Sequence, residues 1–347
     1  MSESRDRRTG LSSRPDRWAR RRFLAALAGG LVAAPLAAQA QSIRKVAFLC
    51  TTWCSSLPNL ISTQDQAFMK ALGQAGFPGG RNLDFDMAGA NVVGYERLPD
   101  AVRRLVNRKP DVILAFGNAA ARAARRATTS IPIVMVLVAD PVEDGLVGSL
   151  SRPGGNMTGL AIPYEQLVAK LIQLVKEINP TVAHVAVIWT SELELAGPRL
   201  ERVATAIRGL SVQLHPVEVH DSRDVEKAFA TLTVARPDAL LLPELSALSA
   251  LLRKEITTFA LKRRLPTIAA DRLLVSSGGL MSYGPYLVDV YERAAIYTAK
   301  VLRGVQPTDL PVEEPTRFEL IISGITAKAL GLTIPPSLLQ RADEVIQ

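Results

Sequence analysis

The sequence contains few residues of the kinds that build metal sites or disulfide frameworks. Its 347 residues include 2 cysteines, 3 histidines and 5% aromatic residues. Cys50 and Cys54 have no nearby histidine, so they cannot supply a four-ligand zinc site. An oxidising compartment would allow these two thiols to pair, but their spacing alone does not decide whether they form a disulfide. We predict neither a metal nor a cofactor.

Motifs of common catalytic sites are also absent. The chain has no G-x-S-x-G elbow, no GxxxxGK[ST] phosphate loop and no Rossmann glycine fingerprint. His184, His215 and His220 lie in or beside predicted strands, away from any serine or cysteine elbow. We therefore do not expect an enzyme. An enzyme that uses carboxylates of a cleft as acid and base is the weaker alternative.

Most of the positive charge lies at the N-terminus. The formal net charge is +8, and residues 1–40 contribute eight arginines against three acidic residues, a net of +5. The remainder has 33 basic and 30 acidic residues, or about +3. This excess is too small to indicate a nucleic-acid partner.

Residues 1–40 have the layout of an export signal peptide. An arginine-rich start precedes the apolar run 23–38, which is short for a membrane span and is broken by Pro35. Ala38-Gln39-Ala40 has the A-x-A form of a cleavage site, and Arg20-Arg21-Arg22-Phe23-Leu24 resembles a twin-arginine (Tat) signal. We predict cleavage after Ala40 and a periplasmic protein without stable membrane insertion, with the Tat or Sec route left open.

The rest of the chain alternates apolar strands with amphipathic helices. Predicted strands cover 45–49, 82–87, 111–116, 131–138, 184–189, 212–219, 239–242, 267–270, 278–285 and 318–322. Predicted helices cover 64–76, 98–106, 119–128, 165–178, 196–209, 223–235, 246–263, 288–303, 326–330 and 337–346. This alternation predicts an α/β fold with parallel sheets covered by helices.

The stretch 131–160 is the organising element of this pattern. Its first part is apolar and β-branched, which indicates a buried parallel strand that ends at Asp140-Pro141. The turn at Gly154-Gly155 then changes the direction of the chain. We interpret it as the passage from one sheet into a second lobe. The alternative is a strand, a loop and another strand of one domain.

Three pairs of segments repeat in the same order. They are KVAFL at 45 with HVAVI at 184, KPDVILAFG at 109 with RPDALLLPE at 236, and IPIVMVLVADP at 131 with LPTIAADR at 265. Each match is short, but a common order indicates duplicated topology. The repeat predicts two Rossmann-like lobes whose strand ends face a shared crevice.

Three runs carry a resemblance to a known family. They are DPVEDGLVGSLSRPGGNMTGL (140–160), GGLMSYGP (278–285) and PVEEPTRFELIISGITAKALGLTIPPSLLQRADEVI (311–346). The chain from about Ile43 to Gln347 resembles the extracytoplasmic substrate-binding proteins of ABC transporters with the type I periplasmic-binding fold, among which are tryptophan- and phenylalanine-binding members. The resemblance implies capture of a small-molecule ligand and its delivery to the transporter's permease subunits.

The same resemblance implies two hinge-linked lobes and a chain that crosses the hinge three times. We assign 42–160 plus about 286–308 to lobe 1, and 161–285 plus about 309–347 to lobe 2. We expect a monomer. The alternative function is that of a ligand-sensing module in a receptor system.

Residues that follow the strands are the candidates for ligand binding, because strand ends converge on the crevice. They are Thr51, Thr52, Trp53, Gly117, Asn118, Asp140, Thr190, Glu244, Asp271 and Tyr283. Helix starts could receive a ligand carboxylate, the acidic side chains a ligand ammonium, and the aromatic rings an apolar part. An amino acid or another amine-bearing solute would suit this set.

Each candidate also has a structural interpretation. Asn118 could be a helix cap, Asp140 could cap a turn, and Asp271 could pair with Arg272. The chain departs from common family patterns at Asn118-Ala119, Thr190-Ser191 and Glu244-Leu245. These positions are expected to contact ligand, so the resemblance does not identify the ligand.

Overall fold

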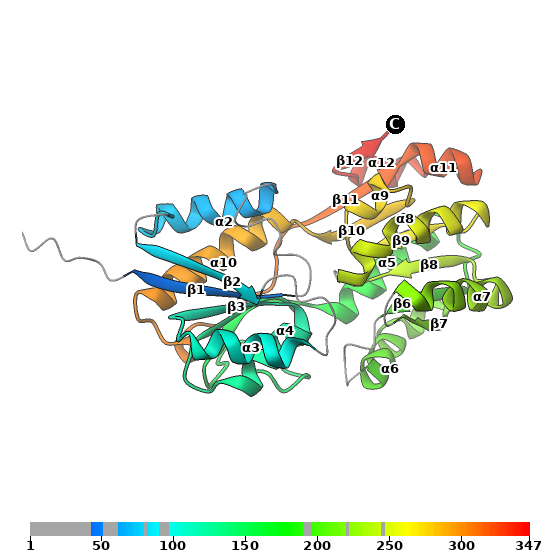
Figure 1. Cartoon of the computed structure of the whole chain (residues 1–347). Helices are drawn as coiled ribbons and strands as arrows, with labels where there is room; N and C mark the ends of the chain where they lie inside the picture. The colour runs from blue at the N-terminus through cyan, green and yellow to red at the C-terminus, as the bar shows by residue number, and fades with distance from the viewer. Residues whose placement is uncertain are drawn as a thin grey trace, which may run out of the picture. The chain divides into compact units, whose positions relative to one another are not determined.

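The computed structural model describes residues 43–50, 62–79, 82–89, 97–189, 196–219, 222–243 and 247–347. In these ranges the chain forms two sheets that are mostly parallel and have helices on their faces, as the α/β class predicts (Figure 1). None of the helices in this part of the chain is both long enough and apolar enough to cross a membrane.

The first sheet is entirely parallel, in the order β2-β1-β3-β4-β5. Its strands are β1 (Arg44–Leu49), β2 (Leu83–Gly89), β3 (Val112–Phe116), β4 (Ile133–Ala139) and β5 (Met157–Ile162). The central strands are apolar and almost wholly buried, because helices cover both faces of the sheet.

Two pairs of helices cover this sheet: α2 (Thr63–Gln74) with α10 (Leu287–Leu302), and α3 (Leu98–Asn107) with α4 (Gly117–Ala127). Figure 1 shows one pair on each face. Successive residues of a strand point to opposite faces, so Phe48 packs in the core beneath α2 and α10. Its neighbours Ala47 and Leu49 pack beneath α3 and α4.

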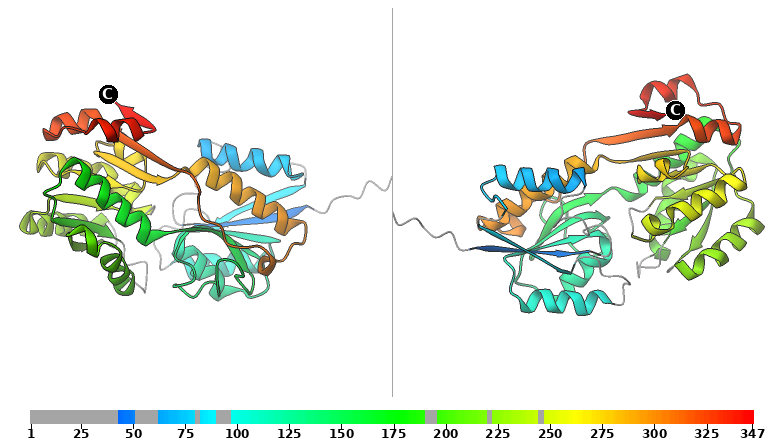
Figure 2. Two further views of the ribbon diagram at one scale, coloured as in Figure 1. Left: turned by 180° about the vertical axis from the view of Figure 1, so that it is seen from behind. Right: turned by 45° about the horizontal axis from the view of Figure 1, so that its top comes forward.

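The second sheet has the order β12-β11-β10-β9-β8-β6-β7, and its neighbouring strands are parallel except β10 with β11. Its strands are β6 (His184–Trp189), β7 (Gln213–Glu218), β8 (Ala239–Leu242), β9 (Thr267–Ala269), β10 (Met281–Pro285), β11 (Phe318–Ser323) and β12 (Glu344–Ile346). Figure 2 shows the antiparallel β10–β11 pair from two further directions.

Helices also cover both faces of the second sheet. They are α5 (Tyr164–Ile178), α6 (Ala196–Ala206), α7 (Val225–Ala235), α8 (Ala247–Lys262), α9 (Leu273–Ser276), α11 (Gly324–Leu330) and α12 (Pro336–Arg341), with short 3₁₀ turns at Arg208–Leu210, Ser222–Asp224 and Pro307–Asp309. Side chains of α5, α6 and α11 share one core cluster, and those of α7 and α8 share the other.

The strand orders confirm the internal repeat. Read from its β7 edge, the second sheet runs β7-β6-β8-β9-β10, which matches β2-β1-β3-β4-β5 strand for strand. The equivalent strands β5 and β10 also share a close approach to a neighbour. A Cβ on Gly159 would lie 2.0 Å from the carbonyl oxygen of Met135, and one on Gly284 would lie 1.9 Å from that of Ala270. Glycine is required at both places because any side chain would overlap backbone.

The chain passes between the two sheets three times. The first pass joins β5 to α5 at Pro163, and the second joins β10 to α10 at Tyr286. The third precedes β11, after a segment that still contacts β5: the Ala161 N–H donates to the Glu313 carbonyl oxygen at 2.8 Å. The predicted lobe boundaries at about 286, 308 and 309 are not tested by these contacts and stay a prediction.

Two sequence-based expectations about these elements are wrong. The turn at Gly154-Gly155 does not lead into a second lobe, because β5 follows it and pairs with β4 in the same sheet. The predicted helix 337–346 is instead the short α12 followed by β12, which pairs with β11. An amphipathic pattern in so short a segment does not distinguish a helix from an edge strand.

Candidate functional site

Half of the predicted ligand-binding residues can be placed. Gly117, Asn118, Asp140, Asp271 and Tyr283 belong to the described part of the chain. Thr51, Thr52, Trp53, Thr190 and Glu244 lie outside the described residues. Cys50, at the end of β1, is disulfide-bonded, whereas Cys54 also lies outside the described residues.

Gly117 joins the end of β3 directly to the start of α4. Its φ is +78°, and a Cβ placed on it would meet nothing within 4 Å. The preceding residue, Phe116, provides no side-chain cap for the helix. The first turn of α4 therefore offers backbone N–H groups and the positive end of a helix dipole beside a half-exposed glycine.

Asn118 uses its side chain to hold the end of β4. Its Nδ2 donates to the carbonyl oxygen of Ala139 at 2.7 Å, and its Oδ1 accepts from the Ala139 N–H at 2.9 Å. The same Nδ2 also donates to Asp144 Oδ2 at 2.8 Å. The side-chain amide thus pairs with the backbone of Ala139 as a paired strand would, and it holds the start of α4 against the end of β4.

Asp140 follows β4 with φ +45°, in the left-handed region. Its Oδ1 accepts from the backbone N–H of Tyr164 at 3.3 Å, and its Oδ2 lies 3.7 Å from Arg199 Nε and 3.9 Å from Arg202 Nη2. Burial and the adjacent Glu165 carboxylate raise the pKa of Asp140 to about 7, against the opposing effect of Arg199. The nearby guanidinium groups therefore only partly compensate its burial.

Asp144 is the most buried charge of this group, with a side-chain exposure of 0%. Arg199 Nη2 donates to its Oδ1 at 3.0 Å, and Arg122 Nη1 lies 3.3 Å from its Oδ2. Arg199 Nη2 also donates to the Ala139 carbonyl at 3.3 Å. A helix that packs on the second sheet therefore binds the carboxyl end of a strand in the first sheet.

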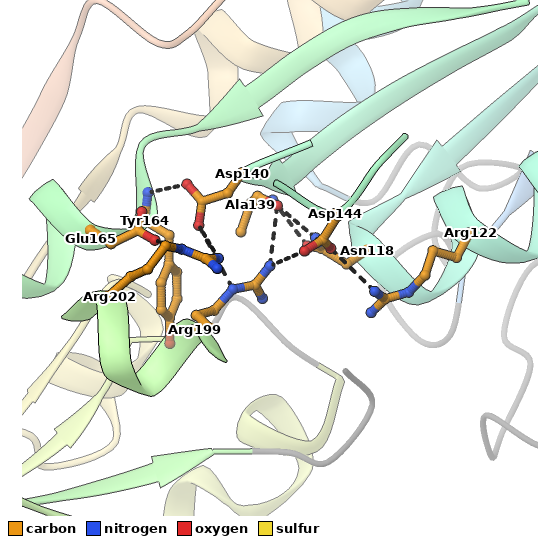
Figure 3. Close-up of polar contacts among 9 residues, drawn as sticks. All are labelled: Asn118, Arg122, Ala139, Asp140, Asp144, Tyr164, Glu165, Arg199 and Arg202. Carbon is orange, nitrogen blue, oxygen red and sulfur yellow. Dashed lines mark hydrogen bonds and ion pairs between the residues drawn. The ribbon is translucent and has the colours of Figure 1, made fainter. Parts of the chain in front are cut away.

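These contacts form one continuous polar network. Its charged members are Asp140, Asp144, Glu165, Arg122, Arg199 and Arg202 (Figure 3). Arg202 Nε donates to Glu165 at 2.6 Å, and this pairing lowers the pKa of Glu165 although burial opposes the shift. The guanidinium groups compensate the buried carboxylates in part, most completely at Asp144 and Glu165.

Asp271 and Tyr283 have other partners. Asp271 Oδ2 accepts from Arg253 at 2.8 Å and its Oδ1 accepts from the Leu273 N–H at 2.9 Å. The predicted Asp271–Arg272 pair is not formed, because Arg272 binds the carboxylates of β11 and β12. The Tyr283 ring stacks on Phe318, with centroids 5.4 Å apart, and burial raises its pKa. Among the described residues, neither one is hydrogen-bonded or ion-paired to the Asp140 network.

Sequence reasoning missed the arginines and Asp144. Arg199 and Arg202 lie three positions apart and so share one face of α6, but charges on a predicted helix are usually assigned to solvent. Asp144 is the last residue of the run DPVED, of which the sequence predicted only Asp140 as a candidate. In the part of the chain that the structure covers, no group of three or more side chains is arranged to hold a metal ion.

The duplicated α/β sheets, which the chain connects three times, define the type I periplasmic-binding fold. The family described as ABC transporter substrate binding protein matches residues 58–346. The chain therefore belongs to this family, which comprises solute-binding proteins rather than enzymes.

Known proteins support this assignment. A tyrosine-binding protein of Clostridioides difficile is 29% identical over 267 residues, which span 77% of this chain and 76% of that protein. A conserved domain protein from Vibrio cholerae has 28% identity and a TM-score of 0.78, with 88% of this chain and all of that one covered. A Streptococcus pneumoniae protein in complex with L-Trp has a TM-score of 0.77 at 22% identity over 88% of this chain and all of that one, which shows a shared fold.

Proposed function

We propose that this protein is the extracytoplasmic receptor of an ABC importer, which binds an amino acid or a related amine-bearing solute between its lobes and delivers it to the permease. The observation that carries the proposal is the family membership of residues 58–346. The tyrosine-binding relative and the L-Trp complex favour an amino acid among possible solutes. We infer a monomer in solution, with lobe 1 and lobe 2 as predicted from the sequence.

Export follows from the N-terminal segment in this proposal. Residues 1–40 would direct the chain across the membrane and be removed after Ala40, which leaves the mature protein in the periplasm. N-terminal sequencing of the exported protein tests the cleavage site, and a start other than Gln41 contradicts it. Export that persists after Arg20-Arg21 is changed to Lys-Lys would contradict the twin-arginine route.

The first turn of α4 is the proposed site for the ligand carboxylate. Gly117 leaves space in front of uncapped helical N–H groups, and such groups bind anions well. The side chain of Asn118 is occupied by Ala139, so it would contribute its backbone and the position of the helix start. Thr51, Thr52, Trp53, Thr190 and Glu244 remain proposed contacts from neighbouring loops.

Asp140 is the better of the two candidate carboxylates for a ligand ammonium. Its Oδ2 accepts no hydrogen bond from the described residues, whereas both oxygens of Asp271 already accept one. Tyr283 and Asp271 stay proposed contacts on the side of the second sheet. Closure of the lobes would then add contacts from both sides, and the permease would recognise the closed form.

Calorimetric titration of the mature protein with L-tyrosine, L-tryptophan, L-phenylalanine and the other proteinogenic amino acids tests the ligand class. We expect saturable 1:1 binding of at least one of them. If none binds to protein whose purified form is free of carried-over ligand, the amino-acid proposal is wrong.

A pair of glycine variants tests the carboxylate site. Gly117→Ala would add a methyl group in front of α4 and strain a left-handed residue, and we expect at least about tenfold weaker amino-acid binding. Gly331→Ala is the matched control, because φ is +74° there and its Cβ also meets nothing within 4 Å. Equal affinities of the two variants would remove the start of α4 from the site.

A further inference from the structure

Two of the three histidines of the chain are in contact, although 31 positions separate them. His184 begins β6, and His215 lies on β7 opposite Ala186, the second residue after His184. Side chains two apart on a strand share a face, so both imidazoles lie on the same side of the sheet. His184 Nδ1 and His215 Nε2 are 3.0 Å apart, with the ring planes at 42°.

This separation suits a shared metal ion. Two nitrogens about 2.1 Å from one ion, at an angle of about 90°, are about 3.0 Å apart. Angles near 90° occur in square-planar, tetragonal and octahedral coordination, whereas tetrahedral coordination separates the two nitrogens further. The observed distance is therefore compatible with two adjacent coordination positions of a Cu²⁺ or Ni²⁺ ion.

The surroundings also suit a cation. Asp238 precedes β8 on the other side of β6, and its Oδ2 accepts from the backbone N–H groups of Ala183 and His184 at 2.9 and 2.8 Å. The Asp238 carboxylate is therefore held at the start of β6, and the imidazole pair is open to solvent at His184.

We propose that His184 and His215 form a binding site for a divalent transition-metal ion, with Cu²⁺ preferred over Ni²⁺ and Ni²⁺ over Zn²⁺. Both nitrogens would direct their lone pairs at the ion, in place of the single hydrogen bond they now share. Water would complete the coordination, because no third metal-binding side chain joins the pair among the described residues. The site lies at the amino ends of β6 and β7, the end opposite to the one where the proposed amino-acid contacts follow their strands, so it is independent of the proposed function.

Titration of the whole chain with CuCl₂ at pH 7.5, followed by electron paramagnetic resonance, tests this site. We expect one Cu²⁺ per chain with modulation from two imidazole nitrogens. His184→Gln and His215→Gln should each weaken binding at least about tenfold and reduce the signal to one imidazole or none. His220→Gln, which removes the remaining histidine, should bind as the unaltered chain does.

The control is the melting temperature of each variant without metal. A value equal to that of the unaltered chain would show that the variant keeps its fold. A rise in melting temperature with Cu²⁺ that is lost in the His184 and His215 variants supports the site, since a ligand of the folded state stabilises it. Unchanged Cu²⁺ affinity in both variants, or a two-imidazole signal that needs His220, would overturn the proposal.

Discussion

Asp140 and Asp271 follow equivalent strands of the two repeats, β4 and β9, but their carboxylates have different partners. Asp271 accepts a short hydrogen bond from Arg253, on a helix of its own repeat, and a second one from a backbone N–H. Asp140 lies 3.7 Å from Arg199, on a helix of the other repeat, and that arginine binds Asp144 more closely. Equivalent positions in a duplicated fold can therefore differ in how completely their charge is compensated.

The difference has a local cause. The backbone of Asp140 is left-handed, and the run that follows supplies a second carboxylate, Asp144, that competes for Arg199. Asp271 has no such competitor four residues later, where Val275 is buried in α9. One repeat thus uses its acidic residue to stabilise a short helix, and the other uses its acidic residues to connect the two sheets.

The largest expected effects concern a feature that both repeats share, the glycines of β5 and β10. Gly159→Ala and Gly284→Ala each place a Cβ about 2 Å from a carbonyl oxygen of the neighbouring strand, so the strands must separate. We expect each variant to lower the free energy of unfolding by about 3 kcal/mol or more. Urea unfolding followed by circular dichroism measures this.

Gly209→Ala is the control for these variants, because its Cβ would meet nothing within 4 Å and its φ is not positive. We expect it to change the free energy of unfolding by less than about 0.5 kcal/mol. Equal stabilities of the Gly159, Gly284 and Gly209 variants would show that the strands do not approach as closely as described.

The next effect separates the two arginines. Among the described residues, Arg199→Met leaves the fully buried Asp144 with only Arg122 and Asn118 as side-chain partners, and we expect a loss of about 3 kcal/mol. Arg253→Met removes the partner of a carboxylate that keeps its backbone hydrogen bond, so we expect about half that loss. Thermal and urea unfolding of both variants measure the two losses in the free energy of unfolding. A larger loss for Arg253→Met would mean that Asp271 depends more on its arginine than Asp144 does.

A smaller effect is expected from Asp271→Asn at pH 7.5. The amide cannot keep the charge-assisted bond to Arg253, and its hydrogen bond to the Leu273 N–H becomes weaker. We expect a loss of about 1 kcal/mol in urea unfolding. Asp271→Glu is a useful control, since it keeps the charge but moves it. A stability equal to that of the unaltered chain would indicate that the Arg253 pair contributes nothing.

The fold was predictable from the sequence to the extent that it depends on periodicity. The alternation of strands and helices and the three repeated segments predicted two similar sheets, and the strand order confirms this. The pattern indicated β5 only in the alternative interpretation of the stretch 131–160, because Met157–Ile162 is short and interrupted by glycine. It did not predict β12, where pairing with β11 decides the conformation.

The candidate site was predictable only in part. Because the carboxyl ends of parallel strands converge, the sequence predicted that Asn118 and Asp140 lie at the same edge of the first sheet. The polar network joins them there. The contribution of Arg199 depends on how α6 packs, which local periodicity does not specify. The partner of Asp271 was missed for a similar reason, since Arg253 lies 18 positions away on α8.

The pH dependence of stability compares the two acidic residues most directly. The pKa of Asp140 rises from 3.8 to about 7 in the folded protein, so the folded state holds this proton more tightly than the unfolded chain does. Protonated Asp140 therefore contributes stability that is fully present below about pH 4 and is lost as the pH rises through about 7. Glu165, whose pKa is lowered, acts in the opposite sense below its ordinary value of 4.5, so the range from pH 5 to 8 separates the effect of Asp140 from that of Glu165.

Asp140→Asn removes the titrating group, and the free energy of unfolding of the unaltered chain should fall relative to this variant between pH 5 and 7. The slope of the difference can reach at most about 1.4 kcal/mol per pH unit, the limit for one proton. Urea unfolding at half-unit pH intervals measures it. Asp271→Asn should keep the slope of the unaltered chain, because Asp140 is intact there. Parallel curves for the unaltered chain and Asp140→Asn would mean that Arg199 and Arg202 compensate Asp140 fully, and the contrast between the two repeats would then disappear.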